Sequence, residues 1–91
     1  MDNAAMLQAL KVDLGIVTDA YDARLEQYLT SAKTAIEIEG ITLTDGVADC
    51  DLVIRYAAWT WRKRASGEAI PRNLRWALNN RLFTERLSGE E

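Results

Sequence analysis

The chain lacks histidine, has one cysteine and one proline, and contains no long uninterrupted apolar run. The single thiol, Cys50, cannot form an internal disulfide, and without a histidine or a second cysteine it cannot complete a usual zinc site. The absence of a long apolar run excludes a membrane span, and the opening Met-Asp-Asn lacks the basic start of a signal peptide. We therefore expect synthesis and folding in a cytoplasm, without a membrane partner.

The usual catalytic groupings are missing as well. The sequence has no serine near a plausible base, no glycine-rich phosphate loop and no CxxC motif, which argues against nucleophilic, nucleotide-dependent and redox chemistry. Asp45, Asp49 and Asp51 lie close together, but their spacing misses the EF-hand calcium pattern and its terminal glutamate. Helix capping by Asp49 or Asp51 is favoured instead. We expect a non-enzyme with no catalytic residue, cofactor or metal.

Length and composition predict one globular domain over residues 1–91. The chain is 48% hydrophobic and 27% charged, which is ordinary for a folded protein of this size. The net charge of −3 is unevenly distributed: residues 1–51 carry ten acids and three bases, a net charge of −7, and residues 52–91 carry eight bases and four acids, a net charge of +4. This asymmetry is expected for head-to-tail packing of copies or for a basic face toward nucleic acid. Solvated helix faces alone are the alternative.

Apolar residues recur at helical spacing, which predicts an all-α fold: a small domain of four helices with an irregular loop between the second and third. The first helix should cover residues 3–14, with Asp2 or Asn3 as N-cap and Gly15 at its end.

The second helix should follow a cap at Thr18 or Asp19 and stop at Gly40. Its apolar stripe consists of Tyr21, Leu25, Tyr28, Leu29, Ala32 and Ile36. Residues 41–50 then lose the helical period and contain the turn dipeptide Asp45-Gly46, which predicts a loop.

The third helix, over residues 51–65, is apolar on two opposite sides. One side carries Val53, Ile54, Ala57, Ala58, Trp61 and Ala65, and the other carries Leu52, Tyr56 and Trp59. The fourth helix, from Pro71 to about Leu87, repeats the pattern, with Leu74, Ala77, Leu78 and Leu82 opposite Trp76, Phe83 and Leu87. The other helices of so short a chain can cover one apolar side of each of these helices, but little of the chain is left to cover the second side. We therefore predict an oligomer or partner interface formed by Leu52, Tyr56, Trp59, Trp76, Phe83 and Leu87. Residues 88–91 should form a flexible polar tail.

Basic residues gather at the end of the third helix and the start of the fourth. We predict that Arg62, Lys63, Arg64, Arg72 and Arg75 form a basic surface toward a partner or a DNA channel. The alternative for Arg62, Lys63 and Arg64 is that they only cap the negative C-terminal end of the third helix and bind no ligand.

Several segments together carry a family resemblance: residues 6–11 (MLQALK), residues 14–16 (LGI) followed by residues 18–22 (TDAYD), and the helix of residues 25–36 with SAK at its centre. An aspartate-rich link, the helix around residues 53–61 and a final helix behind Pro71 complete the order. In this order of elements, over nearly all its length, the chain resembles the small head-tail connector (adaptor) proteins of tailed bacteriophages, often labelled DNA-packaging proteins.

The resemblance implies a homo-oligomeric ring, dodecameric in the mature particle, that attaches beneath the portal protein after DNA packaging. Such a ring extends the DNA channel and docks the stopper or tail-completion protein, so the chain would be made in the bacterial host cytoplasm and reside in the virion at the head-tail junction. DNA must slide through it with only transient contact. We therefore predict that acids or protein partners occupy most of Arg55, Arg62, Lys63, Arg64, Arg72, Arg75, Arg81 and Arg86.

Two other functions remain open from the sequence. One is a small helical nucleic-acid-binding module that uses the third or fourth helix, although the acidic pI of about 4.9 argues against it. The other is a dimeric helical partner protein of the toxin-antitoxin kind, which would be a stable dimer at all concentrations.

Overall fold

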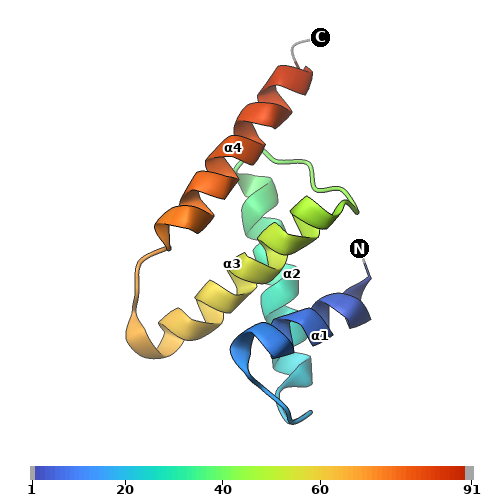
Figure 1. The fold of residues 1–91 in the computed structure, drawn as a ribbon, viewed down its shortest axis with the longest axis vertical. Coiled ribbons are helices and arrows are strands. Elements are labelled where there is room, and N and C mark those ends of the chain that lie inside the picture. Colours follow the sequence, from blue (N-terminus) through green and yellow to red (C-terminus); the bar gives the residue numbers. More distant parts are fainter. Residues whose placement is uncertain (1, 90–91) are drawn as a thin grey trace.

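The computed structural model describes residues 2–89 and contains four helices, with no β-strand in that range. They are α1 (Asn3–Leu14), α2 (Asp22–Ile38), α3 (Val47–Ser66) and α4 (Arg72–Gly89) (Figure 1). The predicted all-α fold and the irregular loop between the second and third helices are confirmed. The helix behind Pro71 continues to Gly89, two residues beyond the predicted end, and residues 90 and 91 of the predicted tail lie outside the described residues.

The boundaries of α1 follow from local signals. The Asp2 carboxylate accepts hydrogen bonds from the backbone N–H groups of Ala4 and Ala5, at 3.0 and 3.4 Å, and so caps the helix. At the other end, Gly15 adopts φ 73°, a left-handed conformation that glycine tolerates at little cost. Both ends agree with the sequence prediction.

The start of α2 differs from the prediction. Tyr21 occupies the N-cap position and its side chain makes no capping bond, so the predicted cap at Thr18 or Asp19 was wrong. Asp19 and Asp22 instead each place a carboxylate oxygen 2.9 Å from the ammonium of Lys11. Lys11 is only 5% exposed, and a buried ammonium requires anionic partners. Hydrogen bonds to Asp19 and then Asp22 raise the pKa of Lys11 above its ordinary value.

The third helix begins at Val47, earlier than the predicted residue 51. Asp49 therefore lies in the first turn of α3 and does not cap it. Its carboxylate accepts hydrogen bonds from the backbone N–H and the hydroxyl of Thr44, both at 2.9 Å, which folds the preceding loop back onto the helix. A negative charge in the first turn also suits the helix dipole. At the other end of α3, Gly67 adopts φ 67°.

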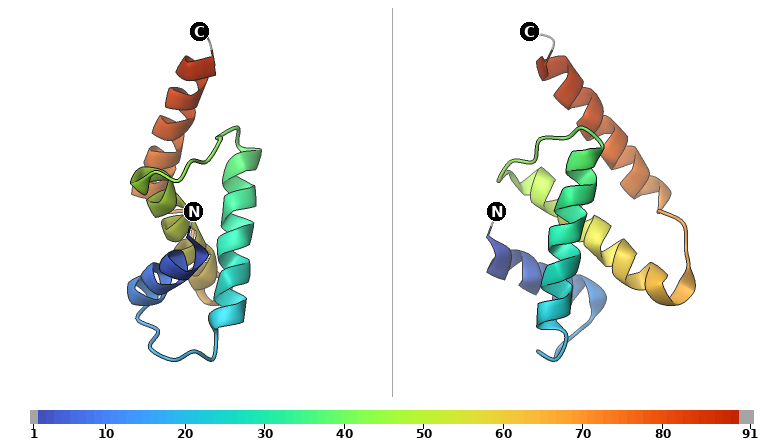
Figure 2. Two further views of the ribbon diagram at one scale, coloured as in Figure 1. Left: turned by 90° about the vertical axis from the view of Figure 1, so that its right-hand side faces the viewer. Right: turned by 180° about the vertical axis from the view of Figure 1, so that it is seen from behind.

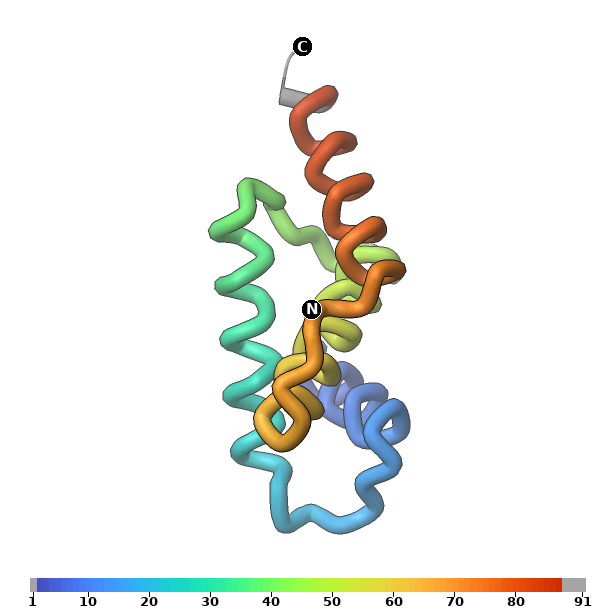
Figure 3. Tube along the Cα trace, turned by 90° about the vertical axis from the view of Figure 1, so that its left-hand side faces the viewer, coloured from blue at the N-terminus to red at the C-terminus, as the bar shows by residue number. Residues whose placement is uncertain are grey.

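The helices form two layers. Seen edge-on, α2 stands alone on one side, and α1, α3 and α4 occupy the other (Figures 2 and 3). α3 lies between α1 and α4, and the C-terminal half of α4 projects beyond the other helices (Figure 1), giving a longest dimension of 46 Å. The core between the layers consists of Met6, Leu7, Leu10, Leu25, Leu29, Ala32, Ile36, Ile41, Leu52, Val53, Ala57, Ala58, Leu74 and Leu78.

Two polar contacts hold α4 to the rest of the chain. One is the ion pair of Arg75 with Glu39 at 2.8 Å, and the larger is a cluster that we call the Arg81 latch. The Arg81 guanidinium donates to Asp49 at 2.8 Å, to the backbone carbonyl of Thr42 at 2.8 Å and to Glu85 at 3.1 Å. Glu85 also accepts from the backbone N–H of Thr42 at 3.1 Å. Burial favours a higher pKa for Asp49, but hydrogen bonds from Arg81 and Thr44 outweigh it and lower the pKa below its ordinary value.

The second apolar side of α3 is covered within the chain. Leu52 is only 5% exposed and belongs to the core, so its assignment to a partner interface was wrong. Tyr56 and Trp59 are half-buried and pack against the core. The Trp59 indole N–H donates to the backbone carbonyl of Glu68 at 3.1 Å, so the linker after α3 covers this side and α4 completes it.

None of the helices in the described range combines the length and hydropathy that a bilayer span requires.

Candidate assembly surface

The outer side of α4 is apolar and uncovered. Trp76 is 70% exposed, Phe83 62% and Leu87 52%, and we call these three side chains the α4 ridge. The opposite side of the helix places Leu74 and Leu78 in the core at 2% and 1% exposure. The two-sided pattern predicted for this helix is therefore present, and only one of its sides is used by the fold.

The ridge is continuous along the helix. Asn80 lies between Trp76 and Phe83, so the residues of the outer side follow one another at intervals of four, three and four. This spacing keeps them on one face of a helix and is the spacing of a coiled-coil seam. Beside it, a groove of about 580 Å³ runs between α3 and α4, with Leu52 and Arg55 on the α3 side. Trp76 and Phe83 of the ridge thus line a groove of mixed apolar and polar character.

The other predicted interface residues, Tyr56 and Trp59, belong to a cluster within the chain. Their aromatic rings meet edge to face with centroids 5.3 Å apart, and the ammonium of Lys63 lies 4.3 Å from the centroid of Trp59. Such contacts stabilise a fold by about 0.5 to 1.5 kcal/mol each. Trp59 is consequently a less available surface than Trp76.

The arginines at the end of α3 also contact side chains of their own chain. Arg62 pairs with Asp13 of α1 at 3.5 Å, and the guanidinium of Arg64 stacks 4.0 Å from the centroid of Trp61. That tryptophan in turn meets Tyr28 edge to face at 5.2 Å. Each cation therefore already has a partner within its own chain.

The remaining basic residues divide into paired and unpaired groups. Arg55 lies 3.6 Å from Asp51, Arg75 lies 2.8 Å from Glu39, and Arg81 belongs to the latch. Within residues 2–89, no ion pair or aromatic contact involves Arg72 or Arg86. Four of the eight basic residues in the second half are thus paired with acids, and two more, Lys63 and Arg64, lie over aromatic rings of the same chain. The prediction that acids or protein partners occupy most of the eight is met by acids for half of them.

The five residues predicted as one basic surface are not brought together. Arg62 contacts the end of α1, near the start of α2, whereas Arg75 contacts Glu39 at the other end of α2. Arg72 is exposed and precedes the ridge by one turn, and Arg86 is exposed near its far end. The unpaired cations consequently flank the α4 ridge and do not extend the cluster at the end of α3.

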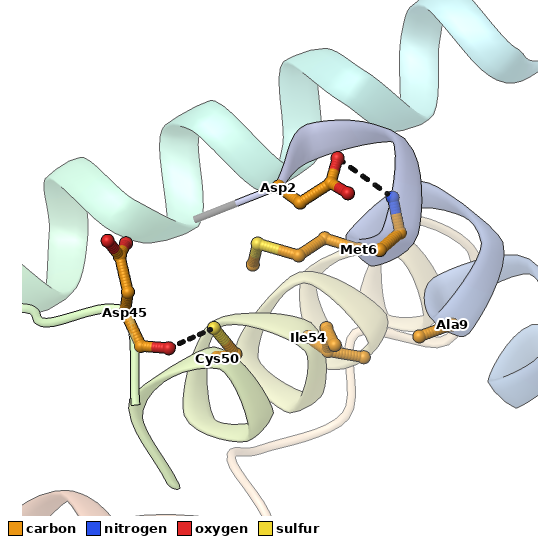
Figure 4. A pocket seen from close by; sticks show the side chains of 7 residues that line it. Asp2, Met6, Ala9, Asp45, Cys50 and Ile54 are labelled. Atoms are coloured by element: carbon orange, nitrogen blue, oxygen red, sulfur yellow. Dashed lines mark hydrogen bonds between the residues drawn. The ribbon is translucent and has the colours of Figure 1, made fainter. Parts of the chain in front are cut away.

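A second groove, which the sequence reading missed, lies between α1 and α3. This α1–α3 furrow has a volume of about 520 Å³ and is lined by Asp2, Ala5, Met6, Ala9, Asp45, Cys50 and Ile54. Figure 4 shows Met6 reaching from α1 over the side chains of Cys50 and Ile54 on α3. The signal for it was the outer side of α1, where small residues, Ala5 and Ala9, recur four residues apart.

The furrow shows no grouping suited to chemistry. The Cys50 thiol is half-buried and lies 3.8 Å from the backbone carbonyl of Asp45. Across the part of the chain that the structure describes, no group of three or more cysteine, aspartate or glutamate side chains is placed to hold a metal ion.

Comparison of the chain with models of protein families, with curated proteins and with solved structures finds no match. The function is accordingly inferred from the surfaces of this chain and from the order of its elements.

Proposed function

We propose that the chain is a structural, non-enzymatic assembly protein of the bacteriophage head-tail connector type. In this proposal it forms a homo-oligomeric ring beneath the portal protein, extends the DNA channel and docks the stopper or tail-completion protein, and its place is the virion. The observation that carries the proposal is the α4 ridge. Large exposed apolar side chains on one face of an anchored helix are characteristic of association sites.

The size of the ridge suits cooperative assembly. Covering roughly 300 Å² of apolar surface on the three side chains, at about 25 cal/mol per Å², favours association by about 7 kcal/mol. The loss of translational and rotational freedom opposes it by about 4 to 15 kcal/mol. One such contact alone is marginal, so a closed ring, in which each copy makes two contacts, is favoured over an open pair.

The state of the basic residues supports a passive DNA channel over a DNA-binding module. Arg55, Arg62, Arg75 and Arg81 are paired with carboxylates, so few positive charges remain for phosphates. We expect filter binding to random duplex DNA at about 0.15 M salt to give dissociation constants no tighter than micromolar. Sub-micromolar binding would favour the nucleic-acid-binding alternative and overturn the channel.

Native mass spectrometry and analytical ultracentrifugation test the assembly. The wild-type protein should form oligomers larger than dimers whose population grows with concentration, and Trp76→Ala should shift them toward monomer while far-UV circular dichroism stays unchanged. Ile38→Ala is the matched control, because Ile38 is 80% exposed and lies outside the ridge. A dissociation constant of about 1 mM corresponds to a contact of only about 4 kcal/mol. A wild-type protein that stays monomeric up to that concentration would refute the proposal. A dimer of constant size would support the partner-protein alternative.

A further inference from the structure

We infer that copies of this chain contact one another head to tail, with the α4 ridge of one copy lying in the α1–α3 furrow of the next. The inference rests on the proposed function and identifies the two surfaces that would form the contact between subunits. It follows from the shapes, the charges and the placement of the two surfaces.

The shapes are complementary. The ridge presents a tryptophan, a phenylalanine and a leucine that stand out from α4, whereas the furrow is a hollow of about 520 Å³. Ala5 and Ala9 line its α1 side and are both exposed. Small side chains allow a second helix to approach closely, because the distance between packed helices depends on the residues at the contact. Ile54, which is half-buried, provides an apolar surface against which large side chains can pack, whereas Met6 also lines the furrow but is itself buried.

The charges are complementary as well. Residues 72–89 of α4 contain four arginines and one glutamate, a net charge of +3, whereas the furrow is lined by two acids, Asp2 and Asp45, and by no base. Pairing of two α4 helices would bring two positive helices together, whereas the furrow places α4 beside the acidic half of a neighbour. Arg72 and Arg86, which flank the ridge, would meet Asp2 at one end of α1 and Asp13, which also pairs with Arg62 of its own chain, at the other.

The dimensions agree. Trp76 and Leu87 are eleven residues apart, and so are Asp2 and Asp13. At 1.5 Å per helical residue both pairs span about 17 Å. A ridge of this length can therefore lie along α1 over the whole outer side of that helix.

The ridge and furrow of one copy are placed so that they do not meet. α3 lies between α1 and α4 (Figure 1), and the ridge faces away from the core that the four helices share. In the proposed contact the furrow therefore receives the ridge of another copy. Since the two surfaces differ, the contact is heterologous and generates a ring or a filament, and it does not stop at a twofold dimer.

The native Cys50 provides the test, because it lines the furrow and is the only cysteine of the chain. In Asn80→Cys the ridge carries a second thiol, and a short bismaleimide should then join ridge to furrow. We expect a ladder of covalent dimers, trimers and larger chains on a denaturing gel. The matched control is Thr34→Cys, an exposed position on α2, which should yield little cross-linking. Removing the furrow thiol in Asn80→Cys/Cys50→Ser should abolish the ladder.

The outcomes separate the two proposals. Efficient dimers of Asn80→Cys/Cys50→Ser would show that α4 pairs with α4, which overturns the head-to-tail contact while leaving assembly intact. An assembled Asn80→Cys protein that cross-links no better than Thr34→Cys would also overturn it. A wild-type protein that is monomeric at every concentration would instead overturn the proposed function.

A mixing experiment provides a second test that does not depend on thiols. Ala9→Arg blocks the furrow at an exposed position, and Phe83→Glu disrupts the ridge. Each variant alone should be monomeric, and an equimolar mixture should form 1:1 dimers and nothing larger, because only one intact ridge and one intact furrow remain. Since a single contact is marginal, these dimers should be populated only at high protein concentration. An Ala9→Arg protein that assembles like the wild type would refute the contact.

Discussion

The Arg81 latch makes a quantitative prediction about what holds α4 in place. Asp49 is 3% exposed and accepts hydrogen bonds from Arg81 at 2.8 and 3.2 Å and from Thr44 at 2.9 Å. Asp49→Ala removes all of these bonds and leaves the Arg81 side chain, itself only 18% exposed, with Glu85 as its remaining carboxylate.

Breaking a buried ion pair by removing one partner costs about 3 to 5 kcal/mol. A domain of this size has a net stability of roughly 5 to 14 kcal/mol, so the loss is a large fraction of the total. At about 4 to 8 °C per kcal/mol, Asp49→Ala should lower the melting temperature by more than about 12 °C. Arg81→Ala should lower it comparably, because it leaves a buried carboxylate without its cation.

Urea denaturation of the two single variants and of Asp49→Ala/Arg81→Ala measures the coupling between the two side chains. The double variant should be less destabilised than the sum of the singles, by about 2 kcal/mol or more. The matched control is Asp51 with Arg55, a more exposed pair on α3 at 3.6 Å, with 60% and 32% of the two side chains accessible, whose coupling should stay below about 1 kcal/mol. A latch coupling no larger than that of the control pair would refute the reasoning.

Three further outcomes are expected. Hydrogen bonding holds the pKa values of Asp49 and Glu85 below their ordinary values of 3.8 and 4.5. The contribution of the two carboxylates to the stability of the fold is therefore complete above about pH 5, and it is lost as the pH falls through their folded-state pKa values. Urea midpoints should drop between pH 5 and 3, and they should drop less steeply in Arg81→Ala. Gly40→Ala should lower the free energy of unfolding by about 1 to 2 kcal/mol, because φ 106° strains any other residue and a side chain of α4 lies 3.3 Å from the new methyl position. An unchanged urea midpoint would contradict this expectation. Trp59→Ala should lower the free energy of unfolding, measured with urea, by about 2 kcal/mol and leave the oligomeric mass unchanged. A change in mass with no loss of stability would instead place Trp59 in the interface.

The sequence predicted the elements whose signals are local. The N-cap Asp2 and the terminal Gly15 lie next to the helix that they delimit, and the stripes of α2 and α4 repeat at the helical period. The start of α3 was missed because Asp49 resembles a cap, while its real partner Arg81 lies 32 residues away. No local pattern indicates a pairing over that distance.

The candidate surface was predicted in part. The ridge of Trp76, Phe83 and Leu87 follows from periodicity alone, whereas Leu52 was assigned to it because nothing in the sequence shows that α4 packs over that side of α3. The burial of Lys11 was also missed, although the residue lies within the apolar stripe of α1. A lysine within an apolar stripe, followed by two aspartates that can reach it, is a pattern that predicts a buried ion pair.

The attachment of α4 also affects how the molecule opens. The helix contacts the body through Leu74 and Leu78, through the Arg75–Glu39 ion pair and through the Arg81 latch, and its C-terminal half projects from the other helices (Figure 1). Amide hydrogens of α4 should therefore exchange with deuterated solvent through a local opening, at a lower free energy than those of α2 and of the buried turns of α3. A neighbour that covers the ridge would slow this exchange, so protection of α4 amides would report on assembly one residue at a time.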